Sequence, residues 1–340
     1  MKLRIHFILS AALMLPLLLL QSCKEEETTK EYMDGSIIVD HDMPTYVQPG
    51  EKYTFKPSGI TAPDGTPVAY YFTAPLTGVK DTLKTDGSVY EYVVPDKLGT
   101  YNLSCIAYAV QSSDKYYVSS ATYTFVVVKD DPVNGSVTNY APSGDFSKVK
   151  IEGRDYYTGK AAGLEWLRSN LCIVKRDASG NEITGRSFKS SPAMQYLFGG
   201  YYTWEEAQTI CPEGWHLPSE AEWVDLLKSV GAPADLQPMQ SSPSGAGKLM
   251  VNAYFNGSAM WDYYRGVDIQ NVALGAIPVG YAEILGGKYK YSGYMEYAVF
   301  WTSDEYEGKG VYRYLFEQFD NVYVGMGDKQ SFAASVRCVR

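Results

Sequence analysis

Histidine, the commonest catalytic base and a frequent zinc ligand, is scarce in this sequence. The 340 residues include three histidines, and His6 lies in an N-terminal segment that we expect to be removed. The remaining two, His41 and His216, are too few for a histidine-rich zinc site, and no His-Glu-x-x-His segment is present. Neither lies in the sequence context of a Ser-His-Asp triad. We therefore expect no catalytic zinc, no resident metal and no cofactor.

Carboxylates are abundant, with 39 acidic residues against 30 basic ones. Glycoside hydrolysis needs only two suitably spaced carboxylates, so an extracytoplasmic hydrolase remains a less favoured alternative. Asp304, Glu305 and Glu307 could offer oxygen ligands to Ca²⁺, although an acidic loop is more often a solvated one. The net charge of −9 disfavours a nucleic-acid partner, because binding to phosphates depends on basic side chains.

Aromatic residues near Gly and Asp in two C-terminal segments offer flat faces that could meet sugar rings or peptides. We predict a metal-free ligand-binding surface there, although each residue could instead be part of the packing. The predicted ligand-binding residues are Trp261, Tyr263, Tyr264, Trp301 and Tyr306.

The N-terminus has the charged start, short apolar middle and small-residue exit of a secretory signal. The apolar run over residues 7–20 is too short to span a bilayer comfortably and leads into Leu-Gln-Ser-Cys. These four residues resemble the bacterial lipobox, which implies that residues 1–22 are a signal peptide and that Cys23 carries the lipid anchor. A plain cleaved signal is the alternative.

The residues that follow Cys23 are polar, which predicts a flexible tether over residues 23–35. Their order, Cys-Lys-Glu-Glu-Glu, resembles the acidic export signal of Bacteroides-type surface lipoproteins. The resemblance implies an outer-membrane protein, anchored in the membrane through lipid and exposed on the cell surface. Retention facing the periplasm is the alternative.

The length allows two domains, and the 45% hydrophobic content excludes a wholly disordered chain. Over residues 36–129 short β-type runs alternate with turn residues, and apolar residues occupy every second position from 101 to 109. This pattern predicts an antiparallel β-sandwich. It resembles the immunoglobulin-like or PKD-like modules of bacterial surface proteins, also in its Gly99-x-Tyr101 corner, and such modules are usually spacers.

Pro, Gly and Asn residues mark a linker over residues 130–145, and a domain over residues 146–340 follows. Capping boxes at Thr203 and Ser219 predict two helices, each with apolar residues at helical spacing. The residues after Lys248 indicate short aromatic strands and long loops. We therefore predict an α+β domain.

Residues 202–223 begin Tyr-Thr-Trp-Glu-Glu-Ala and end Cys-Pro-Glu-Gly-Trp-His-Leu-Pro-Ser-Glu-Ala-Glu-Trp. This segment resembles the signature of the Fibrobacter succinogenes major paralogous domain family. The resemblance implies a C-type-lectin-like fold shared with formylglycine-generating enzyme, with two helices beside a small twisted sheet and loops that carry a binding surface. Family members have no established activity. Further segments of the same pattern lie at residues 163–171, 276–281, 300–303 and 335–339.

The lectin-like resemblance implies one disulfide between Cys211 and Cys338, with two reduced buried thiols as the alternative. Cys105 and Cys172 would then be left over and buried, unless they form a bridge between the domains. The catalytic cysteine pair of formylglycine-generating enzymes is missing, since Cys338 alone follows Cys211. That activity is not implied here.

The signature also contains residues that we assign to the core. We expect Trp215 and Trp223 to be buried anchors, and His216 to be a buried, hydrogen-bonded histidine. The leading hypothesis is a two-domain, surface-anchored, non-enzymatic lipoprotein in which an immunoglobulin-like sandwich carries a C-type-lectin-like domain that binds a glycan or protein ligand. A structural or assembly component of the envelope is the main alternative.

Overall fold

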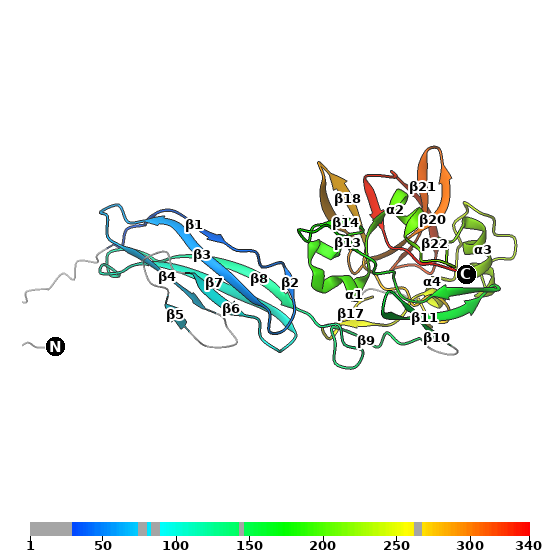
Figure 1. Cartoon of the computed structure of the whole chain (residues 1–340), viewed down its shortest axis with the longest axis horizontal. Helices are drawn as coiled ribbons and strands as arrows, with labels where there is room; N and C mark the ends of the chain where they lie inside the picture. The colour runs from blue at the N-terminus through cyan, green and yellow to red at the C-terminus, as the bar shows by residue number, and fades with distance from the viewer. Residues whose placement is uncertain (1–28, 74–79, 83–88, 143–145, 262–266) are drawn as a thin grey trace, which may run out of the picture.

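The computed structural model describes the chain except at residues 1–28, 74–79, 83–88, 143–145 and 262–266. Cys23, Tyr263 and Tyr264 lie outside the described residues, as does the signal segment. The protein is mostly β-sheet, and Figure 1 shows an elongated pair of sheets joined end to end to a rounded part. In the described part no helix is long and apolar enough to cross a membrane.

Two facing sheets form the elongated part, residues 29–128. One sheet has the order β1 (Asp34–Asp40), β3 (Lys52–Thr61), β6 (Tyr90–Val93). The other has the order β2 (Tyr46–Val47), β8 (Ser119–Val127), β7 (Gly99–Ala109), β4 (Val68–Thr73), β5 (Lys80–Thr82). Phe55, Phe72 and Phe125 belong to the core between them.

Strand β7 shows why these residues form a two-layer structure. Tyr101, Leu103, Cys105, Ala107 and Ala109 are all buried, whereas the residues between them are partly or fully exposed. Successive side chains of a strand point to opposite faces, so the alternating apolar residues bury one face of the sheet. The strand predicted from this alternation is confirmed.

The rounded part contains four further sheets. The sheet nearest the connection has the order β10 (Ser147–Ile151), β11 (Arg154–Ala161), β12 (Leu164–Leu167). A small hairpin joins β13 (Lys175–Arg176) to β14 (Glu182–Thr184). A four-stranded sheet has the order β15 (Tyr202–Thr203), β23 (Phe332–Ala334), β18 (Tyr281–Leu285), β19 (Lys288–Ser292). The last has the order β20 (Tyr297–Tyr306), β21 (Lys309–Phe316), β22 (Val322–Gly327).

Short helices lie around these sheets: the 3-10 helices at Phe188–Ser190 and Pro192–Met194, then α1 (Gln195–Phe198), α2 (Trp204–Ile210), α3 (Glu220–Ser229) and α4 (Ala246–Leu249). Both predicted capping boxes form. Thr203 Oγ1 accepts from the Glu206 amide at 3.2 Å, and the Glu206 carboxylate accepts from the Thr203 amide at 2.9 Å. Ser219 and Glu222 make the same exchange at 3.3 and 2.7 Å. The two predicted helices, α2 and α3, are confirmed.

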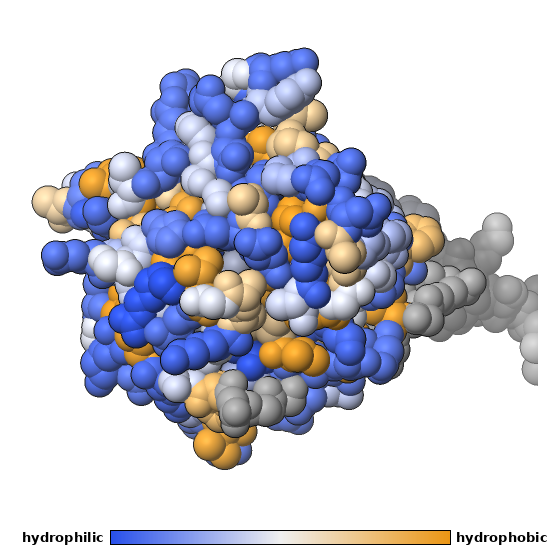
Figure 2. Space-filling view, turned by 90° about the vertical axis from the view of Figure 1, so that its right-hand side faces the viewer, coloured by the Kyte–Doolittle hydropathy of each residue, from blue (hydrophilic) through white to orange (hydrophobic). Residues whose placement is uncertain are grey.

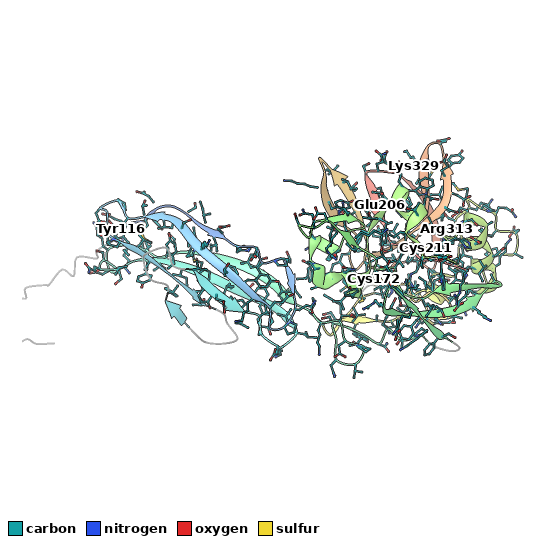
Figure 3. All side chains as sticks on the ribbon, in the orientation of Figure 1. Tyr116, Cys172, Glu206, Cys211, Arg313 and Lys329 are labelled. Atoms are coloured by element: carbon teal, nitrogen blue, oxygen red, sulfur yellow. A yellow bond between two sulfur atoms is a disulfide. The ribbon has the colours of Figure 1, made fainter. Side chains whose placement is uncertain are left out.

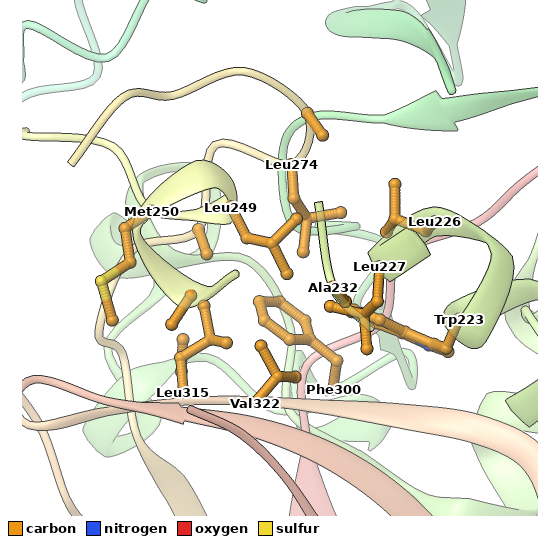
Figure 4. Packing of buried hydrophobic residues seen from close by; sticks show 14 of the residues in the cluster. Trp223, Leu226, Leu227, Ala232, Leu249, Met250, Leu274, Phe300, Leu315 and Val322 are labelled. Carbon is orange, nitrogen blue, oxygen red and sulfur yellow. The ribbon is translucent and has the colours of Figure 1, made fainter. Parts of the chain in front are cut away.

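Helix α3 covers the β20–β22 sheet and closes the largest core (Figure 4). Trp223 and Leu227 point from the helix toward Phe300 and Val322 of the sheet. Trp223 is fully buried, as predicted, and lies edge-on to Trp166 with 5.4 Å between ring centroids. The helix thus packs through the apolar stripe that its sequence spacing predicts.

A buried ion pair fixes the start of α3 to the sheet. Arg313 of β21 donates from Nε to Glu220 Oε1 at 2.9 Å, and both side chains are at most 1% exposed (Figure 3). Asp304 of β20 accepts from the Glu220 amide at 2.8 Å. The first turn of α3 is therefore attached to two strands through charged and backbone groups.

The connection between the two parts is packed and hydrogen-bonded. The Tyr46 ring of β2 lies 5.6 Å from Phe188 and 6.4 Å from Phe255 of the rounded part. The Asn256 side chain donates to the Val127 carbonyl at 3.1 Å. Beyond Val128, β9 (Val137–Thr138) pairs with β16 (Tyr254–Phe255), which in turn pairs with β17 (Ser258–Ala259). Much of the segment predicted as a linker is therefore docked on the rounded part.

Candidate functional site

A groove of about 360 Å³ lies where the connecting segment crosses the rounded part. Its walls come from residues 130–141, from β10 and β11, and from the short helix α1. We call it the linker groove. Its volume falls within the range of small-ligand sites, roughly 300–1,000 Å³. The lining residues on which its chemistry depends are Asp130, Tyr140, Arg154, Tyr157, Asn170 and Tyr196.

Arg154, at the start of β11, holds the two sides of the groove together. It donates from Nη1 to Asp130 Oδ2 at 2.6 Å and from Nη2 to the Tyr196 carbonyl at 2.8 Å. Its guanidinium also lies over the Tyr196 ring, 4.7 Å from the ring centre. One arginine therefore positions the connecting segment, through Asp130, and an aromatic face on α1.

Asn170 forms part of the groove lining with a buried amide that is only 6% exposed. Its Nδ2 donates to the Phe198 carbonyl at the end of α1, at 2.8 Å. That bond determines the orientation of the amide, because only the nitrogen can donate to a carbonyl. The buried Oδ1 accepts no hydrogen bond. A buried acceptor without a donor costs about 1–3 kcal/mol, which a bound donor would recover.

Gly199 is required next to this amide. Its φ of +85° lies in the left-handed region, and a Cβ there would come within 2.5 Å of Asn170 Cβ. Glycine adopts this conformation without the steric penalty that other residues meet. The chain can therefore leave α1 directly beside Asn170.

Below the groove, Tyr156 and Cys172 form a neutral pair. The Tyr156 hydroxyl lies 2.8 Å from Cys172 Sγ and accepts from the Cys172 amide at 3.2 Å. Burial raises the pKa of Tyr156 above its usual range, and burial also raises the pKa of the Cys172 thiol. Both groups stay protonated at neutral pH, so Cys172 is not poised as a thiolate nucleophile.

The acidic side chains that line the groove each have a cationic partner. Asp130 pairs with Arg154, Asp131 lies 3.0 Å from Lys129, and Asp155 lies 3.8 Å from Lys150. The remaining lining cation, Lys148, lies over the Tyr157 ring at 5.1 Å. The groove thus combines hydrogen-bonding groups and aromatic faces with charges that are locally balanced.

Two of the predicted ligand-binding residues are fully buried, which corrects the expectation that they face a ligand. The Trp261 indole donates to the Ala276 carbonyl at 3.1 Å, and the Trp301 indole donates to the Tyr202 carbonyl at 2.7 Å. Because each indole N–H finds a buried acceptor, both side chains can be enclosed. Their rings are core, and the structure does not place them at one surface with Tyr306.

Tyr306 is the predicted ligand-binding residue that remains exposed, at 49%. It ends β20 at the turn into β21, a hairpin that Figure 1 places on the opposite side of the rounded part from β10. Beside it, the candidate calcium ligand Asp304 accepts the Glu220 amide, and Glu305 pairs with Lys329. Among the described residues, no three His, Cys, Asp or Glu side chains gather as a metal site would require.

The predicted disulfide between Cys211 and Cys338 is confirmed, with 5.9 Å between the two Cα atoms. It joins the end of α2 to the C-terminal segment. Cys105 and Cys172 are free and buried, so they form no bridge between the two parts. Figure 3 shows Cys172 and Cys211 at separate places in the rounded part.

His216 differs from the prediction, because its side chain is 52% exposed. Its Nε2 lies 2.8 Å from Glu222 Oε1, so the predicted hydrogen bond is present. The neighbours Trp215 and Leu217 are buried, and the residue bridges to Val339 in extended conformation. In an extended segment alternate side chains face opposite ways, which turns His216 outward.

Other parts of the rounded surface show less organisation. Figure 2 views the face that points away from the elongated part, where polar residues predominate and hydrophobic residues form small separate patches. Single exposed apolar residues of this kind are normal on soluble surfaces. The linker groove therefore remains the feature best suited to hold a ligand.

Sequence reasoning missed the linker groove. Its walls come from residues 130–141, 148–157, 169–170 and 196–199, which are distant in sequence and contain no recognised motif. The aromatic pair Tyr156-Tyr157 beside the charged pair Arg154-Asp155 is the one local signal that could have drawn attention to it.

Residues 160–340 match the family model described as Fibrobacter succinogenes major domain. No curated protein matches the sequence. The matched region contains α2, α3 and the disulfide, and it begins inside β11. The groove residues Asp130 and Arg154 lie before it, whereas Asn170 and Tyr196 lie within it.

Proposed function

The chain belongs to the Fibrobacter succinogenes major domain family, and from this premise we propose that it is a surface-anchored, non-enzymatic lipoprotein whose C-terminal domain binds a glycan or protein ligand. The observation that carries the binding proposal is the linker groove, in which Arg154 fixes Asp130 and Tyr196 around about 360 Å³ of space. Such a groove can hold a small ligand or one segment of a larger one.

The anchor is proposed from the sequence alone. An apolar run ends at Leu-Gln-Ser-Cys, and the acidic residues behind Cys23 resemble a surface-export signal. Stable attachment takes more than one acyl chain, which a lipidated N-terminal cysteine of this kind would carry. The proposed place is the outer membrane, with the body of the protein outside the cell.

For the fold we propose an immunoglobulin-like or PKD-like module over residues 36–129 and a C-type-lectin-like domain over residues 146–340. The first is supported by two facing sheets and by the Tyr101 hydroxyl, which donates to the Lys97 carbonyl at 2.5 Å in the manner of a tyrosine corner. The second is supported by two capped helices beside small sheets and by the bridge from α2 to the C-terminal segment.

The environment of the histidines supports a non-enzymatic role. His216 is hydrogen-bonded to Glu222, the residue that caps α3. His41 lies against the rings of Phe55 and Tyr123, at 5.1 and 4.5 Å, inside the elongated part. Each histidine is thus held by local structure, away from the linker groove.

A binding test needs the connecting segment as well as the family domain, because Asp130 and Ala141 line the groove. We would probe the soluble chain from residue 24 onward on glycan and peptide arrays. Ala141→Trp should fill the groove and reduce binding, whereas Val133→Trp adds the same bulk to an exposed site outside the lining. A chain that binds on neither array would favour the structural or assembly role instead.

A further inference from the structure

We propose that the linker groove selects a neutral glycan, with Tyr196 as the stacking face, Asn170 as a buried hydrogen-bond acceptor and Asp130 as an acceptor at the rim. This inference rests on the proposed binding function and adds the chemical class of the ligand. Three properties of the groove carry it: a fixed aromatic ring, an unpaired buried acceptor and balanced charge.

The Tyr196 ring is exposed enough to stack and is held in place. The side chain is 46% exposed, and the Arg154 guanidinium lies over the ring at 4.7 Å. The same arginine is tied to Asp130 and to the Tyr196 carbonyl, so the ring is supported from beneath by a fixed cation. An aromatic ring held in one orientation binds the apolar C–H face of a sugar with little loss of conformational entropy.

The unpaired acceptor calls for a ligand that donates. Asn170 Oδ1 is buried and accepts no hydrogen bond, while its Nδ2 is already occupied by the Phe198 carbonyl. A ligand hydroxyl that reaches this oxygen would satisfy it, and the carboxylate of Asp130 can accept from further hydroxyls at the rim. A sugar carries several such donors on the edges of a flat apolar ring.

The charge balance argues against an ionic ligand. An acidic sugar would have to compete with Asp130 for Arg154, and a basic peptide would have to compete with Arg154 for Asp130. Asp131 already accepts from the amides of Val133 and Asn134. A neutral ligand keeps these interactions and requires no ion pair to be broken, which would leave a charge without its partner.

The experiment titrates the soluble chain, from residue 24 onward, with three sets of probes. These are neutral gluco-, xylo- and manno-oligosaccharides, uronic-acid and sulfated oligosaccharides, and a library of short peptides. We expect saturable binding of at least one neutral oligosaccharide. Tyr196→Ala and Asn170→Leu should each weaken it by about tenfold, the size of a lost stacking contact or hydrogen bond.

Matched variants keep the test decisive. Tyr196→Phe retains the ring and should bind like the unmodified protein. Tyr306→Ala removes an equally exposed tyrosine from the β20–β21 hairpin and should also leave affinity unchanged. Because Tyr196 is exposed, Tyr196→Ala should unfold at nearly the same temperature as the unmodified protein, which separates lost binding from lost folding even if Asn170→Leu proves unstable.

The outcomes distinguish the two levels of the proposal. Groove-dependent binding of peptides or acidic sugars, with no neutral oligosaccharide bound, would overturn the inference and leave the binding function standing. Neutral binding that Tyr196→Ala and a folded Asn170→Leu both leave intact would overturn the groove assignment. If no probe of any class binds, the inference and the proposed function both fail.

Discussion

Asp130 and Arg154 form the contact that makes a groove out of two separate segments of the chain, with 2.6 Å between Arg154 Nη1 and Asp130 Oδ2. Both side chains are about one-third exposed, at 31% for Arg154 and 38% for Asp130. An ion pair so accessible to water adds about 0–1 kcal/mol to stability. Its importance is therefore positional, since it fixes the connecting segment opposite Tyr196.

The aromatic residues that the structure buries should behave as core. Trp261→Ala should lower the free energy of unfolding by about 3–5 kcal/mol, because it removes a large, fully buried side chain and leaves a cavity. Tyr306→Ala should change it by less than about 0.5 kcal/mol, since the side chain is half exposed. Denaturant unfolding of both variants tests this, and equal losses of stability would contradict the assignment.

The disulfide should contribute strongly to stability. Cys211 and Cys338 are separated by 127 residues in sequence, and closing a loop of that length should contribute roughly 3–5 kcal/mol. Cys211→Ser should lose about that amount in urea unfolding. Reducing agent should destabilise the unmodified protein and leave Cys211→Ser unchanged. Recovery of both cysteines as free thiols in an unreduced digest would argue against the bridge.

The Glu220–Arg313 pair predicts non-additive substitutions. Glu220→Leu should cost about 3–5 kcal/mol, because it leaves the Arg313 guanidinium buried without its carboxylate. Adding Arg313→Met should recover much of that loss. A double-mutant cycle measured by denaturant unfolding gives the coupling between the two side chains. Purely additive losses would mean that the pair is not coupled as the structure indicates.

The stability of the connecting segment should depend on pH through Asp131. Hydrogen bonds from the amides of Asn134 and Val133, together with Lys129, hold the pKa of this carboxyl below its usual range. The folded form therefore favours the carboxylate. Its contribution is present above the unfolded pKa of about 4 and is lost as the pH falls further. Melting temperatures of the native protein and Asp131→Asn should differ at pH 6 and converge toward pH 2, whereas a constant difference would contradict the assignment.

Lipidation at Cys23 predicts a simple change of location. Cys23→Ala should release the protein from the membrane fraction, because the anchor is lost. Protease added to intact cells should degrade the native protein if it faces outward. Full protection of the native protein, with Cys23→Ala still released, would favour a periplasmic orientation.

Local sequence signals determined much of the secondary structure. The capping boxes at Thr203 and Ser219 specify where α2 and α3 begin, because their hydrogen bonds involve residues only three positions apart. The alternation from Tyr101 to Ala109 likewise specifies strand β7 and its buried face. The disulfide was predicted from a long motif that resembles a known family, and the match over residues 160–340 supports that source.

Tertiary structure alone decided which aromatic residues face water. Trp261 and Tyr306 both lie in segments with Gly and Asp nearby, yet one is enclosed and the other is half exposed. The difference for Trp261 is the Ala276 carbonyl, which accepts the indole N–H from another segment of the chain. No local pattern encodes that contact, so composition could not separate binding residues from packing residues.

The linker groove is also a product of the tertiary structure. Asn170 lacks an acceptor partner only because α1 ends at Phe198 beside it, and Tyr196 is held only because Arg154 reaches it from β11. Local hydrogen bonds and strand alternation act over a few residues, so the sequence by itself determined the helix starts, the strand faces and the probable chemistry of single side chains. The meeting of segments 130–141, 154–157 and 196–199 depends on long-range packing, which is why the folded chain was needed to reveal where a ligand could bind.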